Sequence, residues 1–91
     1  MVKIDKYDYF VSDKQSKKLY VIVNGKKIYF GDSNYQHYKD KTGLLAKSQN
    51  HLDEKRRASY LARASKIKDK SGALTANNPN SPNYHAIRIL W

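Results

Sequence analysis

Basic side chains recur along the segment 53–70, DEKRRASYLARASKIKDK, and they are suited to contact a polyanion. On a wheel of 3.6 residues per turn four of them gather on one face together with Ser59. Cations about two turns apart along a helix match the phosphates of a nucleic-acid strand. The spacing therefore predicts phosphate contacts from a basic stripe made of Arg56, Arg63, Lys66 and Lys70.

A second candidate surface combines tyrosine with lysine. In the stretch KLYVIVNGKKIYF, alternation places Tyr20, Lys27 and Tyr29 on the same face of a hairpin. Tyrosine rings offer flat surfaces for base stacking or for protein contact, and lysine attracts phosphate. We therefore add these three residues, together with Arg88 near the C-terminus, to the candidate nucleic-acid contacts. The same pair of tyrosines would also stabilise the hairpin without any ligand.

Signals for an enzyme are weak in this chain. The three histidines, His37, His51 and His85, lie in separate predicted loops or loop edges. No glycine-rich phosphate loop of the P-loop type is present, and no serine-nucleophile pattern occurs. We predict a non-catalytic protein without metal or cofactor. A metal-dependent nuclease is the low-ranked alternative, and it would require His51, Asp53 and Asp40 to converge.

Charge is the strongest feature of the composition. The 91 residues carry 18 Lys and Arg against 8 Asp and Glu, a formal net charge of +10. Such a surplus on a small surface concentrates polyanions, of which nucleic acid is the commonest. The chain has no cysteine, which excludes disulfides and thiolate metal sites. The N-terminus has no apolar leader and no segment could span a membrane, so we predict a soluble protein.

The elements that must position these residues begin with a hairpin. Asn24-Gly25 between two apolar runs indicates a two-residue type I′ turn. That turn pairs Val23 with Lys26, Val21 with Ile28, and Leu19 with Phe30. A further strand is predicted over 7–12, which gives a three-stranded antiparallel sheet. The segment 35–52 has no sustained period and is predicted as a loop.

One helix is predicted over 53–68, with Asp53 as N-cap and Gly72 beyond its end. The C-terminal YHAIRILW alternates and is predicted as a strand or extended tail. The expected fold is a single α+β domain, 1–91, with this helix across the apolar face of the sheet. The predicted core consists of Leu19, Val21, Val23, Ile28, Phe30, Leu61, Ala64, Ile67, Ile87 and Trp91.

The chain beyond residue 17 resembles a family of small basic proteins of tailed bacteriophages and large DNA viruses. The resemblance is carried by a hairpin ending in Phe-Gly, a tyrosine-rich segment, a His-x-Asp-x-x-Arg-[RK]-x-x-Tyr-x-x-Arg element and a terminal Leu-Trp. The matching positions are Phe30-Gly31, Tyr35, Tyr38, His51, Asp53, Arg56, Arg57, Tyr60, Arg63, Leu90 and Trp91. The family commonly has Arg-His where this chain has Arg63-Ala64. The family has no assigned enzymatic activity, so the resemblance implies a viral origin more than a mechanism. The expected location is the host cytoplasm or the virion.

Three functions follow as hypotheses. The first is a viral protein that binds nucleic acid through the basic stripe. The second is a structural virion protein, such as a capsid cement or head–tail component, that makes protein contacts through Tyr35, Tyr38 and Trp91. The third is an inhibitor of a host defence or nucleic-acid enzyme, which the positive charge makes least favourable. The sequence does not separate DNA from RNA and does not give the oligomeric state.

Overall fold

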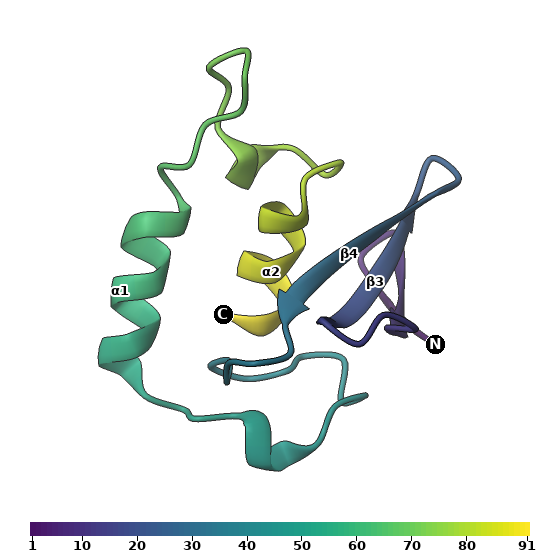
Figure 1. The fold of residues 1–91 in the computed structure, drawn as a ribbon, viewed down its shortest axis with the longest axis vertical. Helices are drawn as coiled ribbons and strands as arrows, with labels where there is room; N and C mark the ends of the chain where they lie inside the picture. Colours follow the sequence, from purple (N-terminus) through teal and green to yellow (C-terminus); the bar gives the residue numbers. More distant parts are fainter.

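The computed structural model describes all residues, 1–91, as one α+β unit with a sheet, two helices and two short 3₁₀ turns. The antiparallel sheet has the strand order β1-β2-β3-β4. Figure 1 shows three layers, in which α2 lies between the sheet and α1. The elements are β1 Val2–Ile4, β2 Tyr7–Val11, β3 Lys17–Val23, β4 Lys26–Asp32, η1 Lys47–Gln49, α1 Glu54–Ala64, η2 Thr75–Asn77 and α2 Pro82–Leu90.

The central hairpin, β3 and β4, forms in the predicted register. Val23 pairs with Lys26, Val21 with Ile28, and Leu19 with Phe30. Asn24 and Gly25 both have positive φ, 51° and 79°, as a type I′ turn requires. The predicted strand over 7–12 is also present, as β2.

The prediction of three strands and one helix is wrong, because the sheet has four strands and the fold has two helices. The added strand, β1, is only three residues long and pairs with β2 across a turn at Asp5, whose φ is 56°. Neither its length nor its turn residues give a strong signal in the sequence.

The C-terminal segment is a helix rather than a strand or tail. The Ser81 side chain accepts a hydrogen bond from Asn83 N, and Pro82 occupies the first turn, where a proline needs no N–H partner. Alternation at Ile87 and Ile89 suggested a strand, but burial follows the helical period. The buried residues of α2 are His85, Ala86, Ile89 and Leu90.

The sheet is covered by α2 and not by α1, which is a further correction. The main core cluster contains Tyr9, Leu19, Val21, Val23, Ile28, Phe30, Ala86, Ile89 and Leu90. Of the other predicted core residues Ala64 is buried, Leu61, Ile87 and Trp91 are only partly buried, and Ile67 is 50% exposed. Ile67 is outside the core because α1 ends at Ala64, earlier than predicted.

Candidate functional site

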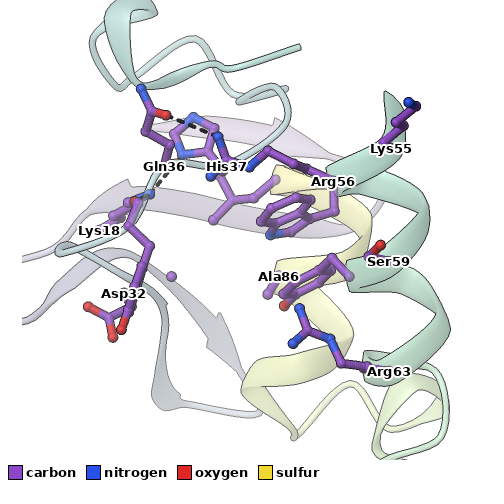
Figure 2. Close-up of a pocket in the computed structure, with 14 residues that line it drawn as sticks. Lys18, Asp32, Gln36, His37, Lys55, Arg56, Ser59, Arg63 and Ala86 are labelled. Atoms are coloured by element: carbon purple, nitrogen blue, oxygen red, sulfur yellow. Dashed lines mark hydrogen bonds between the residues drawn. The ribbon is translucent and has the colours of Figure 1, made fainter. Parts of the chain in front are cut away.

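A basic groove of about 670 Å³ runs along α1, between this helix and the segment 31–37. The last residues of α2 and Trp91 contribute to its lining. Figure 2 shows Arg56, Ser59 and Arg63 on the α1 side and Lys18, Asp32 and His37 on the other. The charged residues of the lining are Lys18, Lys55, Arg56, Arg63 and Asp32. Four cations thus face one carboxylate, and we call this site the basic groove.

The first turn of α1 sets the position of the helix cations. The predicted N-cap is confirmed, because the Asp53 carboxylate accepts hydrogen bonds from Lys55 N at 2.9 Å and Arg56 N at 3.3 Å. Arg56 Nη1 also donates to Gln36 Oε1 at 3.3 Å. No carboxylate lies within 4.0 Å of the charged groups of Lys55, Arg56 or Arg63. These groups are therefore available to an anionic ligand.

An aromatic stack forms one wall of the groove. The rings of Tyr60 and Trp91 are 4.0 Å apart between centroids, with planes inclined by 7°. Arg57 Nε donates to the Trp91 carbonyl at 2.8 Å, which ties the end of α2 to α1. Burial raises the pKa of Tyr60, and the charge of Arg63 opposes this rise. Tyr60 is therefore partly buried by its contact with Trp91.

The opposite wall contains a buried chain of hydrogen bonds. Lys18 Nζ donates to Tyr35 O and to His37 Nδ1, the latter at 3.0 Å. Because Nδ1 accepts, His37 is neutral and its Nε2 donates to Asn50 Oδ1 at 2.6 Å. Burial lowers the pKa of His37, and the charge of Lys18 lowers it further. In this wall the Lys18 ammonium is therefore hydrogen-bonded only to uncharged acceptors.

The structure brings together some of the predicted contacts and separates others. Arg56 and Arg63 line the basic groove, and so do Tyr35 and Trp91 from the alternative partner set. Lys66 and Lys70 lie beyond the end of α1 and do not line it. Two further candidates also lie elsewhere: Arg88 forms an ion pair with Asp5, and Tyr38 donates to Glu54.

The second predicted surface is on the opposite side of the sheet from α2. Its rings form a ladder, in which Phe10 stacks on Tyr20 at 4.9 Å and Tyr20 meets Tyr29 at 5.4 Å. Its cations already have partners: Lys27 Nζ is 3.7 Å from the Asp13 carboxylate and 4.9 Å from the Tyr20 ring, and Lys14 Nζ is 4.1 Å from the Tyr29 ring. We call this surface the aromatic sheet face.

The residues considered for metal binding have other roles. Asp53 caps α1, and Asp40 accepts hydrogen bonds from Thr42 and Leu45 in its own loop. His51 Nδ1 accepts from Asp53 N. No group of three His, Asp or Glu side chains is arranged to hold a metal ion.

Sequence reasoning missed Lys18 and Lys55 as groove residues. Lys55 precedes Arg56 and lies one helical turn from Ser59, so the helical wheel could have included it. Lys18 lies near the start of β3, at the edge of the hairpin. Its role depends on His37, 19 residues away, for which the sequence gives no periodic signal.

None of the helices is long and apolar enough to cross a membrane. Comparisons with models of protein families, with curated proteins and with solved structures gave no match. The resemblance to small basic viral proteins therefore stays a prediction.

Proposed function

We propose that this chain is a non-catalytic protein that binds nucleic acid through the basic groove. Arg56 and Arg63 would contact phosphates from the α1 side, in the roles expected from their spacing, and Lys55 would extend the contact toward the start of the helix. The observation that carries the proposal is the excess of four cations over one carboxylate in the groove lining. The α1 cations that line the groove, Lys55, Arg56 and Arg63, have no carboxylate within 4.0 Å.

The net charge of +10 supports the same proposal, because it attracts polyanions over a longer range than the groove itself. Binding governed by phosphate contacts must weaken with salt as counterions are released. A capsid or head–tail role would instead depend on protein contacts, and an inhibitor would depend on its target enzyme. Neither of these alternatives predicts a steep salt dependence with nucleic acid alone.

The test is fluorescence anisotropy with a labelled single strand and a labelled duplex, titrated from low to physiological salt. For the wild type, we expect the logarithm of the binding constant to fall with the logarithm of the salt concentration with a slope of several units. Arg56→Ala and Arg63→Ala should each reduce it by about one. Lys26→Ala is the matched control, because it removes one exposed charge that does not line the groove. Lys26 begins β4 at the tip of the β3–β4 hairpin, and Figure 1 shows this tip away from α1.

The proposal fails if binding is weak at low salt or if both arginine variants bind as the wild type does. The groove would then be more consistent with an acidic protein partner. In that case the next experiment is a search for the chain in purified virions, which tests the alternative of a structural virion protein.

A further inference from the structure

Lys18 is an unusual cation because it is buried at the groove, with only 9% of its surface exposed. Its stem lies over Gly31, the residue opposite it in β4. A Cβ on Gly31 would be 3.2 Å from Lys18 Cβ and 3.4 Å from Lys18 Cδ. The absence of a side chain at Gly31 therefore makes room for the lysine to cross toward the groove.

The ammonium group of Lys18 is only partly satisfied within the protein. It donates to two neutral acceptors, Tyr35 O and His37 Nδ1, and no carboxylate lies within 4.0 Å of it. An ammonium has three N–H donors, so one remains for a ligand. A buried cation without a counter-ion is unfavourable. Burial lowers the pKa of Lys18, and the more distant Asp32 and Asp40 oppose this shift.

The aromatic wall also has unused donors. Neither the Tyr60 hydroxyl nor the Trp91 indole N–H makes a hydrogen bond within the protein, although both residues line the groove. Tyr35, another lining residue, is 69% exposed, so its ring is available for stacking. The groove thus combines a buried ammonium, free hydrogen-bond donors and an exposed aromatic ring.

The size of the groove limits what can enter it. Its volume of about 670 Å³ is in the range of small-molecule sites and is large enough for one nucleotide. A duplex keeps its bases paired inside and can present only its backbone to the rim. A single strand can turn one base and its phosphate inward.

We infer that the basic groove binds one unpaired nucleotide of a single strand, with its phosphate on Lys18 and its base between Tyr35 and the Tyr60–Trp91 wall. This inference rests on the proposed function, since it names the form of nucleic acid that the same site takes. Arg56 and Arg63 hold the neighbouring phosphates along α1. The protein therefore prefers a single strand to a duplex of equal length.

Trp91 is the only tryptophan, so its fluorescence reports on the groove directly. We would titrate the full chain with an oligothymidylate and with a duplex of the same length at one low salt concentration. We expect the single strand to bind about tenfold tighter and to quench Trp91. Lys18→Met should remove most of this preference and leave duplex binding nearly unchanged.

A second pair of variants keeps the test decisive if Lys18→Met does not fold. Ser59→Glu places a negative charge in the groove, whereas Ala58→Glu places the same charge on an exposed position of α1 outside it. Of these two variants, Ser59→Glu should abolish the preference for the single strand and Ala58→Glu should keep it. Folding of each variant is checked by circular dichroism.

Equal affinity for the two forms in the wild type would overturn the inference, as would a preference unaffected by both Lys18→Met and Ser59→Glu. If salt-dependent binding still falls in Arg56→Ala and Arg63→Ala, the proposed function stands and only the inference fails. If no salt-dependent binding occurs with either form, the proposed function itself fails.

Discussion

The basic groove and the aromatic sheet face have similar compositions, because each places tyrosine beside lysine or arginine. They differ in whether the cations have partners. On the sheet face Lys27 is near the Asp13 carboxylate, and Lys14 lies over the Tyr29 ring. In the groove Arg63 has no carboxylate within 4.0 Å. Residue type alone therefore does not separate the two surfaces, whereas the presence or absence of partners for their cations does.

The largest expected effect comes from reversing charge on the two surfaces in turn. Arg56→Glu with Arg63→Glu should weaken nucleic-acid binding on the order of a hundredfold, because attraction to phosphate becomes repulsion. Lys14→Glu with Lys27→Glu changes the net charge equally and should weaken binding only slightly. Anisotropy at one salt concentration measures both. An equal loss in the two double variants would show that net charge, and not the groove, governs binding.

The groove lining and the turn of the hairpin that carries the aromatic sheet face each contain a glycine with positive φ. The loss of stability on replacing the glycine should differ between the two. Gly25, at the hairpin tip, has no atom within 4 Å of an added Cβ, so Gly25→Ala should cost only backbone strain of about 1 kcal/mol. At Gly31 the added Cβ would also lie 2.8 Å from Leu90 Cδ1. We expect Gly31→Ala to lower the free energy of unfolding by about 2 kcal/mol.

Urea denaturation of the two glycine variants measures this difference. Equal losses would mean that Leu90 and Lys18 move aside without cost. The groove would then be more deformable than the close contact at Gly31 indicates.

We expect mild acid to destabilise the side of the sheet that contacts α2 more than the aromatic sheet face. His85 Nε2 donates to Pro79 O at 2.7 Å, so its Nδ1 accepts the Tyr9 hydroxyl at 2.9 Å and the ring is neutral. Burial lowers the pKa of His85, and likewise that of His37 in the groove wall. The unfolded chain therefore binds more protons than the folded chain in mild acid.

The stability that neutral histidine gives is fully present above the unfolded pKa of about 6.5 and is lost as the pH falls toward the lower folded value. We expect Tm to fall by several degrees between about pH 7.5 and about pH 5.5, where carboxylates remain mostly ionised. His85→Gln, which can keep a donor and an acceptor, should reduce this dependence. A Tm that stays level or rises over the same range would contradict the prediction.

The smallest effect concerns the hydroxyl of the aromatic sheet face. Tyr29 donates to Asp13 Oδ1 at 2.6 Å, and this bond raises the pKa of Tyr29 to about 12. In Asp13→Asn the pKa should return toward the ordinary value of about 10, since the anionic acceptor is gone. Nuclear magnetic resonance of ¹³C-labelled tyrosine follows the titration. Asp8→Asn is the control and should leave the Tyr29 titration unchanged.

The parts of the fold that could be predicted from the sequence depend on local chemistry. Asn24 and Gly25 determine the turn, and the turn determines the register of β3 and β4. Asp53 marks the start of α1 because its side chain caps the helix. The face that carries Arg56 and Arg63 follows from helical periodicity alone.

The parts that could not be predicted depend on contacts between distant residues. The alternation of Ile87 and Ile89 favours a strand, and it conflicts with the helix-start signal of Ser81 and Pro82. The groove forms only when Lys18 meets His37 and Tyr60 meets Trp91, pairs separated by 19 and 31 residues. The amphipathic pattern of one helix does not show which distant segment packs beside it.

The position of α2 has a consequence for the order of folding. The apolar side of the sheet contacts this helix, so strands made from residues 2–32 must wait for residues 82–90 before their core is complete. Bonds such as Tyr9 to His85, 76 positions apart, raise the contact order of the fold. We therefore expect slow folding through an early hairpin with an exposed apolar face, and this transient species is the point at which the chain is most exposed to aggregation.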